Sequence, residues 1–256
     1  MKSLISKNES RVALVTGGTK NIGLSICKAL LDSNIKVAFL GSTEESVLNA
    51  AQNELQEYVN KNQAQGFLCD LSDVENIPSL INSVSQKFGQ IDIIINAAGI
   101  LDLSSVEETS EEIWNKVLAV NLSSPFFLIQ NALPFLKNSN AARVINIASN
   151  AGRMGGYANG MSYTASKGGL ISLTYGLARQ LAKWKITVNC VAPGTIDSDM
   201  LKSRDTDTKA ELLKKFPLER YGECHEVAEA VMYFVSVNAG FTTGAVLDVN
   251  GGLFTG

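Results

Sequence analysis

Tyr163 and Lys167 are the residues of this chain whose types and spacing most clearly point to chemistry. They stand four positions apart, and a helix places such positions one above the other on the same face. A lysine ammonium beside a phenol favours the ionised phenolate. We therefore expect Lys167 to lower the pKa of Tyr163 from its usual value of about 10, so that Tyr163 exchanges protons near neutral pH.

Ser149 adds a third group to this pair. It lies fourteen residues before Tyr163, shortly after an apolar run. Its hydroxyl could hydrogen-bond the oxygen that gains negative charge when a carbonyl accepts a hydride. The three residues together predict machinery for proton transfer and oxyanion stabilisation. A Tyr-x-x-x-Lys pair also arises by chance in many helices, so this interpretation depends on motifs elsewhere in the chain.

The composition favours one α/β domain over residues 1–256. With 256 residues and 45% hydrophobic content, the chain is long enough to bury a sizeable core. The net charge of −3 shows no basic excess, so nucleic-acid binding is not expected. The single histidine, His225, lies in a polar stretch and is expected on the surface, so no zinc site or Ser-His-Asp triad is expected. The four cysteines are expected as free thiols, three of them buried: Cys27, Cys69, Cys190 and Cys224.

One uncharged stretch has the length of a membrane span. Residues 117–136 carry no charge, but they include Asn, Ser, Gln and Pro side chains, which favour a buried helix of a soluble protein. The first ten residues lack the apolar core of a signal peptide. We therefore expect a cytoplasmic protein that does not bind membranes.

The glycine-rich stretch GGTKNIG, residues 17–23, follows a β-branched run at 11–16 and precedes a helical pattern. A strand, a glycine turn and a helix start form a phosphate cradle, because the free N–H groups and the dipole of the helix favour a pyrophosphate. The spacing is not GxGxxG. Asn21 stands where a further glycine is expected, and asparagine tolerates the left-handed backbone better than most residues.

The end of the next strand, at residues 35–40, indicates which dinucleotide is preferred. Dinucleotide folds that bind NAD carry an acidic residue here, which holds the ribose 2′-hydroxyl. This position is neutral, and the side chains suited to a 2′-phosphate are Lys20, Ser42 and Thr43. We therefore expect NADP rather than NAD. Glu44 or Glu45 would reverse this preference if either reached the ribose.

The remaining segments alternate between strand and helix patterns. Strands are expected at 66–71, 91–95, 143–147, 186–191 and 245–249, and helices at 43–61, 73–88, 109–137, 161–183 and 223–236. Such alternation predicts a doubly wound parallel sheet of seven strands with right-handed crossovers. Ligands of such sheets bind beyond the carboxyl ends of the strands.

Three further features have two interpretations each. Asp70 could bind the adenine amino group or form a capping turn with Ser72 and Asp73. Pro125 removes the helical partner of the Asn121 carbonyl, which could bind a water that connects Lys167 to solvent, or the helix could simply kink. The charged, irregular region near 195–220 could form a mobile substrate lid or a solvated helix pair.

These motifs in this order resemble the short-chain dehydrogenase/reductase family in its single-domain form, over residues 11–252. The motifs are TGGTKNIG at 16–23, NAAG at 96–99, the Ser149, Tyr163 and Lys167 set, and Pro193-Gly194. The resemblance implies a Rossmann-type fold and an NADPH-dependent reduction of a ketone. It implies that Tyr163 donates the proton, that Ser149 steadies the carbonyl oxygen, that Lys167 holds the nicotinamide ribose, and that Asn121 places a relay water.

The resemblance also implies which residues contact the cofactor and how the protein assembles. Cofactor contacts are expected from Gly17, Thr19, Lys20, Asn21, Ile22, Gly23, Ser42, Thr43, Asp70, Leu71, Asn96, Ala97, Ala98, Gly99, Tyr163, Lys167, Pro193, Gly194 and Ile196. Members of the family are usually homotetramers.

Within the family, three stretches resemble the 3-oxoacyl-acyl-carrier-protein reductases of fatty acid biosynthesis: 152–156, 191–200 and 243–252. A 3-oxoacyl thioester is therefore the expected substrate, and acyl carrier protein is a possible partner. Basic residues that could dock this partner are Lys137, Arg143, Lys183 and Lys185. Two alternatives stay open, a dehydrogenase of sugars, polyols or other secondary alcohols, and a dinucleotide-binding sensor without catalysis. The intact Asn121, Ser149, Tyr163 and Lys167 set speaks against a sensor.

Overall fold

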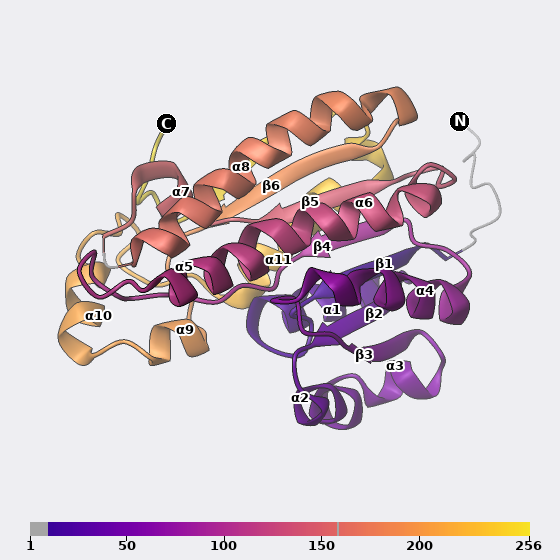
Figure 1. The fold of residues 1–256 in the computed structure, drawn as a ribbon, viewed down its shortest axis with the longest axis horizontal. Helices are drawn as coiled ribbons and strands as arrows, with labels where there is room; N and C mark the ends of the chain where they lie inside the picture. Colours follow the sequence, from indigo (N-terminus) through magenta and orange to yellow (C-terminus); the bar gives the residue numbers. More distant parts are fainter. Residues whose placement is uncertain (1–9, 158) are drawn as a thin grey trace.

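A computed structural model describes residues 10–157 and 159–256, which fold around one seven-stranded sheet in the order β3-β2-β1-β4-β5-β6-β7 (Figure 1). The strands are β1 Val12–Thr16, β2 Lys36–Gly41, β3 Ala64–Leu68, β4 Ile93–Asn96, β5 Arg143–Ile147, β6 Thr187–Pro193 and β7 Val246–Val249. Every neighbouring pair is parallel. The predicted Rossmann-type, doubly wound sheet is therefore confirmed. Residues 1–9, which hold most of the stretch that lacks a signal-peptide core, lie outside the described residues.

Helices cover both faces of this sheet. Their bounds are α1 Asn21–Asp32, α2 Glu44–Asn49, α3 Gln56–Asn60, α4 Ile77–Phe88, α5 Glu111–Leu118, α6 Ser124–Leu136, α7 Ala151–Met154, α8 Met161–Leu181, α9 Asp199–Lys202, α10 Thr206–Leu213 and α11 Cys224–Val235. Buried side chains of α1 and α11 form one core with the sheet, and those of α4, α6 and α8 form a second core on the other face.

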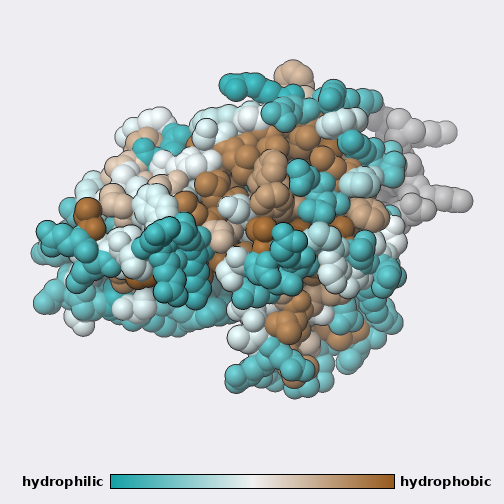
Figure 2. Space-filling view, in the orientation of Figure 1, coloured by the Kyte–Doolittle hydropathy of each residue, from teal (hydrophilic) through white to brown (hydrophobic). Residues whose placement is uncertain are grey.

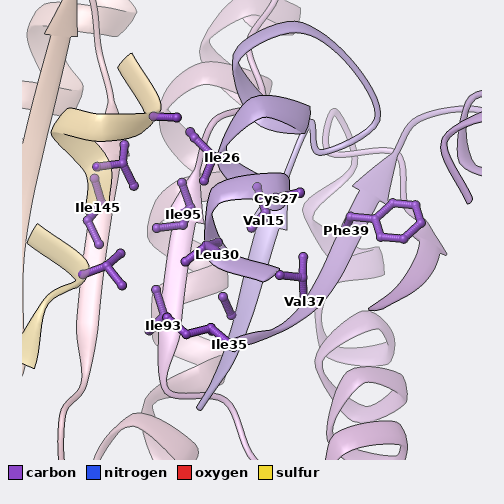
Figure 3. Close-up of a cluster of buried hydrophobic side chains, with 14 of the residues drawn as sticks. Val15, Ile26, Cys27, Leu30, Ile35, Val37, Phe39, Ile93, Ile95 and Ile145 are labelled. Carbon is purple, nitrogen blue, oxygen red and sulfur yellow. The ribbon is translucent and has the colours of Figure 1, made fainter. Parts of the chain in front are cut away.

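The strands are apolar on both sides because both faces are covered. In β1, Val15 packs into the core of α1 and α11, whereas its neighbour Leu14 packs into the core of α4, α6 and α8. Successive side chains of a strand point to opposite faces, so one strand serves both cores. Figure 3 shows the first core, with Ile26 and Leu30 of α1 beside Val15 and Ile95. This packing fixes the carboxyl ends of β1, β4, β5 and β6, where the site lies.

The third strand differs from the prediction of 66–71. β3 spans Ala64–Leu68 because its pairing with β2 ends where Gly41 meets Leu68. The chain then turns at Asp70, whose carboxylate accepts hydrogen bonds from the Ser72 backbone at 2.9 Å and from the Ser72 hydroxyl at 2.8 Å. Residues 69–71 therefore form a loop.

The predicted helix at 109–137 is present but contains a wider turn. A π-helical segment, Ala119–Ser123, lies between α5 and α6, directly before Pro125. Such turns often occur at functional sites. The combined run Glu111–Leu136 has the length and mean hydropathy of a membrane span, and no other helix in the described ranges does, but 44% of its apolar window is buried inside the protein. Leu128, Ala132 and Leu136 of α6 pack against the sheet, as expected for a core helix.

Candidate active site

The glycine turn after β1 closes so tightly that side chains are excluded. Gly17 has a φ of +64°, and a Cβ at Gly23 would lie 2.0 Å from the Gly17 carbonyl oxygen. Asn21 has a φ of 48°, which confirms that asparagine takes the left-handed backbone here. α1 begins at Asn21, so its first turn follows the glycines directly. These close approaches build the phosphate cradle that the sequence predicts.

A cavity of about 540 Å³ lies over this turn, at the carboxyl ends of β1, β2 and β4. It brings together most of the predicted cofactor residues: Gly17, Thr19, Lys20, Asn21, Ile22, Gly23, Ser42, Asp70, Leu71, Ala97, Ala98 and Gly99. Lys116 and Met200 also line it, although no sequence motif marks them. The close backbone at the turn and the size of the cavity fit a dinucleotide.

Two predicted cofactor residues are engaged elsewhere in the described part of the chain. The Thr43 hydroxyl accepts a hydrogen bond from the Ser46 backbone at 3.2 Å and caps α2. Asn96 is buried, and its amide donates to Asn146 Oδ1 at 2.8 Å, so it links β4 to β5. Asp70, by contrast, both forms the predicted turn with Ser72 and lines the cavity. These hydrogen bonds lower the pKa of Asp70, so it is ionised at neutral pH.

A second cavity, of about 120 Å³, contains Ser149, Tyr163 and Lys167. We call it the catalytic pocket. Pro193, Gly194 and Ile196 line it too, as the predicted cofactor contacts. It shares walls with the nucleotide cavity, namely Ile22, Ala97, Gly99, Ser198 and Met200. The two cavities therefore adjoin, and a group bound in one can meet a group bound in the other.

Tyr163 and Lys167 lie on the first turns of α8, as their spacing predicts, and both are buried. The Lys167 ammonium lies 5.8 Å from the centre of the Tyr163 ring and donates a hydrogen bond to the Ile147 carbonyl at 2.8 Å. Burial lowers the pKa of Lys167 to about 8. The same burial raises the pKa of Tyr163, against the opposing effects of a hydrogen bond with Ser149 and of the Arg204 charge.

The prediction that Lys167 brings the pKa of Tyr163 down toward neutrality is therefore wrong for this structure. Desolvation of the buried phenol outweighs the hydrogen bond with Ser149 and the charge of Arg204, because a phenolate loses its hydration when it is buried. Tyr163 is consequently protonated at neutral pH and is prepared to donate a proton.

Ser149 follows the end of β5, where the predicted strand delivers it. Its hydroxyl lies 3.2 Å from Asn150 Oδ1 and accepts a hydrogen bond from the Ala151 backbone at 3.1 Å. The second contact lies at the start of α7 and fixes the position of the hydroxyl in the pocket. Ser149 and Tyr163 line the same pocket, so both can reach one carbonyl oxygen.

Asn121 lies inside the π-helical segment and is fully buried. Its amide exchanges two hydrogen bonds with the Ile100 backbone, at 2.9 Å and 3.0 Å, and donates a third to the Ser166 hydroxyl at 3.1 Å. Asn121 therefore ties the loop after β4 to α8. Gly99 separates it from Lys167, since a Cβ at Gly99 would lie 3.2 Å from the Lys167 nitrogen and 3.4 Å from Asn121 Oδ1. The water relay through the Asn121 carbonyl stays a prediction.

The lid segment, residues 195–220, contains α9 and α10 and is anchored by buried Leu201, Leu212 and Phe216. At the start of α9, Asp199 pairs with Lys20 at 3.2 Å and accepts a hydrogen bond from Asn21 at 3.1 Å. The cation predicted to receive the 2′-phosphate is thus paired with a lid carboxylate. The composition of the segment gives no signal of this contact. The opening of the lid stays a prediction.

Arg204 is a residue of the catalytic pocket that sequence reasoning missed. It follows α9 and lines the pocket together with Ser149, Tyr163 and Asn159. Its guanidinium donates a hydrogen bond to Asn159 Oδ1. No motif marks it, because it lies in an irregular, charged stretch that carries several other basic residues.

The basic residues predicted to dock a carrier protein lie far from this pocket, so that prediction is wrong. Arg143 begins β5 and is buried, where it donates hydrogen bonds to the Ser236 and Val237 carbonyls. Lys183 lies beyond the far end of α8, about 30 Å from Tyr163 by the rise of a helix. Lys137 ends α6 and Lys185 precedes β6. All four lie toward the amino ends of the strands, because a parallel sheet places strand starts at one edge and ligands at the other.

The other expectations on reactive groups agree with the structure. Cys27, Cys69 and Cys190 are buried free thiols, and Cys224 is a half-buried one. His225 is exposed and lies 3.2 Å from Glu223.

Comparisons with known proteins agree with this geometry. A family model for short chain dehydrogenases matches residues 11–209. The chain is 35% identical over 246 residues to a 3-oxoacyl-acyl-carrier-protein reductase of Salmonella typhimurium. It is 36% identical over 248 residues to the corresponding reductase of Escherichia coli. Each alignment covers 96% of this chain and 98% of the relative.

Among solved structures, the chain is similar to a blue fluorescent protein from a metagenomic library, in a crystal structure with NADPH. The TM-score is 0.88 and the identity is 31%, over 96% of this chain and 98% of that protein.

Proposed function

Because the chain belongs to the short-chain dehydrogenase family, we propose that it uses NADPH to reduce the ketone of a 3-oxoacyl thioester to a secondary alcohol. It is an NAD(P)-dependent oxidoreductase that acts on CH–OH groups. The observation that carries the proposal is the shared wall of the two cavities. It places Tyr163 and Ser149 beside the cavity over the glycine turn, within reach of a dinucleotide bound there.

The nucleotide cavity supports NADPH as the cofactor. Ser42, at the end of β2, lines the cavity with a neutral side chain, so a 2′-phosphate meets no carboxylate at that position. Lys20 lines the cavity as well and supplies a positive charge. Glu44 and Glu45 lie exposed in the first turn of α2, after the Thr43 cap. The structural relative at TM-score 0.88 was crystallised with NADPH.

When bound, NADPH supplies the hydride that reduces the carbonyl carbon. Tyr163, kept protonated by burial, donates its proton to the carbonyl oxygen, and Ser149 hydrogen-bonds the same oxygen. Lys167 lies against Gly99, which lines both cavities, and would hold the ribose of the cofactor. At neutral pH the raised pKa keeps Tyr163 in the protonated form that reduction requires.

The relatives support the choice of substrate. Both enzymes compared above are named as reductases of 3-oxoacyl groups on acyl carrier protein. An acyl carrier protein is therefore the proposed partner, and it would approach the carboxyl ends of the strands, beside the lid segment. A cytoplasmic location accords with this role and stays a prediction.

A homotetramer is proposed as the assembly. Large apolar side chains are exposed on α5 and α8, namely Ile113, Trp114, Met161 and Tyr175. In Figure 2 the apolar surface gathers where Figure 1 draws α6 and α8, whereas hydrophilic residues cover the α9–α10 region. Apolar surface of this kind supports self-association. Light scattering after gel filtration would give the mass that tests it.

The test of the function is NADPH oxidation with an acetoacetyl thioester, followed by absorbance, with Tyr163→Phe as the matched control. Phenylalanine keeps the ring packing and removes the proton. We expect oxidation by the wild type and its loss in the variant, with NADPH binding retained. If the wild type binds NADPH but does not reduce the thioester, a sugar, polyol or other secondary alcohol becomes the leading substrate class. If the protein binds NADPH but reduces none of these compounds, the alternative of a dinucleotide-binding sensor without catalysis would be favoured.

A further inference from the structure

Asp102 is a buried aspartate in the loop between β4 and α5, next to Leu101 of the catalytic pocket. Its carboxylate accepts a hydrogen bond from the Ser162 hydroxyl at 2.5 Å and another from the Ser104 backbone at 2.9 Å. Ser162 directly precedes Tyr163 in α8. The carboxylate therefore joins the loop after β4 to the residue beside the proton donor.

Asp102 also holds the start of α8. The N-cap of this helix is Gly160, which has no side chain to accept hydrogen bonds from the first turn. The Gly160 N–H donates to the Asp102 carbonyl at 2.8 Å. A Cβ at Gly160 would lie 2.1 Å from Asp102 Oδ2, so the carboxylate packs directly against the Gly160 backbone. The backbone and the side chain of Asp102 thus both contact the turn that carries Tyr163.

The carboxylate of Asp102 is ionised at neutral pH. Burial raises its pKa, but the hydrogen bonds from Ser162, Ser104 and Leu103 outweigh this effect and bring the pKa below its usual value. Hydrogen bonds to an ionised group are about twice as strong as those between neutral groups. A negative charge is also favoured at the N-terminus of a helix. The contact between Asp102 and α8 is therefore a strong one.

A second contact holds the same part of α8. The Ser166 hydroxyl donates a hydrogen bond to the Tyr163 carbonyl at 2.7 Å and accepts one from the Asn121 amide at 3.1 Å. Asn121 is in turn bound to the Ile100 backbone. The loop after β4 therefore holds this turn at two points, through Asn121 and through Asp102.

We propose that Asp102 is a positioning residue for the reduction, which anchors the first turn of α8 so that the Tyr163 hydroxyl stays beside Ser149 in the catalytic pocket. Asp102 acts on the phenol through its contacts with Ser162 and Gly160. Rates depend steeply on such placement, since a displacement of about 1 Å can cost about a hundredfold in rate. This inference rests on the proposed ketone reduction, to which it adds a residue.

The test measures kcat and KM for the acetoacetyl thioester, together with the Kd for NADPH, in Asp102→Ala. We expect kcat to fall about ten- to hundredfold, while the Kd for NADPH stays that of the wild type, because the glycine turn is unchanged. Asp102→Asn keeps the hydrogen-bonding atoms and loses only the charge, so it should restore part of kcat. If Asp102→Asn is as slow as Asp102→Ala, the anchoring by hydrogen bonds is overturned.

Asp92→Ala is the matched control, because Asp92 is an aspartate of the same kind at the opposite edge of the sheet. It is buried, and its carboxylate accepts hydrogen bonds from the Ser139 hydroxyl at 2.6 Å and from the Val12 backbone at 2.8 Å. Urea denaturation should show a loss of stability in both alanine variants, whereas only Asp102→Ala should lose kcat. A similar loss of kcat in Asp92→Ala would mean that general destabilisation is the cause, and it would overturn the positioning role.

Gly160→Ala disturbs the same contact without changing Asp102, and it decides the question if Asp102→Ala does not fold. The backbone of Gly160 (φ −63°, ψ 157°) is open to alanine, but the new Cβ would collide with the carboxylate. We expect kcat to fall in Gly160→Ala. Adding Gly160→Ala to Asp102→Ala should lower kcat little further, because alanine at position 102 removes the oxygen that the Cβ meets.

The proposed function and this inference fail in different ways. If the wild type does not reduce the thioester, the proposed function fails, and the inference fails with it. If the wild type reduces the thioester and both Asp102→Ala and Gly160→Ala keep its kcat, the positioning role is overturned, while the ketone reduction stands.

Discussion

The carboxylate of Asp199 lies 3.2 Å from the ammonium of Lys20 and so connects the lid segment to the glycine turn. The same oxygen accepts a hydrogen bond from Asn21 at 3.1 Å. Lys20 and Asn21 line the nucleotide cavity. A 2′-phosphate that binds at Lys20 would therefore compete with Asp199 for the same cation. The Lys20–Asp199 pair connects the lid segment to the glycine turn, and we expect it to weaken the binding of NADPH.

Removing the charge of Asp199 should strengthen NADPH binding. Both side chains are largely exposed, so the pair is weak, and we expect Asp199→Asn to lower the Kd for NADPH about two- to fivefold. The Kd for NADH, which has no 2′-phosphate, should change little. Calorimetric titration measures both. An equal change for the two cofactors would show that Asp199 does not compete with the phosphate.

An acidic residue at the end of β2 should reverse the cofactor preference. In Ser42→Asp, the new carboxylate would repel the 2′-phosphate and accept a hydrogen bond from the 2′-hydroxyl. We expect the ratio of Kd for NADPH to Kd for NADH to rise about tenfold or more. The control Ser42→Asn introduces a side chain with the shape of aspartate but without its charge, and it should leave the ratio of the two Kd values near that of the wild type. A similar shift in both variants would mean that size, rather than charge, decides the preference.

The pH dependence should follow the protonation of Tyr163. Reduction needs the protonated phenol, so its rate should fall as the pH rises through the Tyr163 pKa, which burial raises, at a pH above that at which Lys167 titrates. Oxidation of the alcohol needs the phenolate and should increase over the same range. Arg204→Gln removes a charge that lowers this pKa, so both limbs should move to higher pH.

The methyl esters of the 3-oxo and 3-hydroxy acids serve for this pH profile, because they carry no carboxylate, and the enolisation of the 3-oxo ester at high pH is measured separately without enzyme. If the pH profiles of reduction and oxidation are the same in Arg204→Gln as in the wild type, the charge of Arg204 does not affect the pKa of Tyr163.

The glycine turn gives a prediction on stability. A Cβ at Gly23 would lie 2.0 Å from the Gly17 carbonyl oxygen, so Gly23→Ala forces the turn apart. We expect a loss of about 1–3 kcal/mol in the free energy of unfolding, together with weaker NADPH binding. Gly176→Ala is the matched control in α8, where a Cβ meets no atom within 4 Å among the described residues.

In Gly176→Ala the free energy of unfolding should rise by about 0.5–1 kcal/mol, because alanine favours a helix interior. Urea denaturation of both variants measures these effects, and equal stability of the two would contradict the role of the turn.

The strands and the spacing of Ser149, Tyr163 and Lys167 could be predicted from the sequence because both depend on local patterns. β-Branched runs mark strands buried on both faces, and positions four apart share a helix face whatever surrounds them. The helix α8 and the cavity over the glycine turn follow from such patterns. For the same reason, the proposed catalytic set can be predicted without knowledge of the fold.

The features that the sequence does not reveal depend on the surroundings of a residue. The raised pKa of Tyr163 results from its burial, which a Tyr-x-x-x-Lys spacing does not report. The contacts of Asp199 with Lys20 and of Arg204 with Asn159 join residues far apart in the chain. The position of Arg143 could not be predicted for a related reason. Arg143 is the first residue of β5, and only the direction of this strand in the sheet shows that Arg143 lies at the edge opposite the site.

Ser198 and Met200 form part of the wall of both cavities, with α9 between the glycine turn and the catalytic pocket. A substrate bound in the catalytic pocket would lie against this wall, which also lines the nucleotide cavity. The enzyme should therefore follow a compulsory order, in which the nucleotide enters first and leaves last. The alcohol product would then inhibit non-competitively against NADPH.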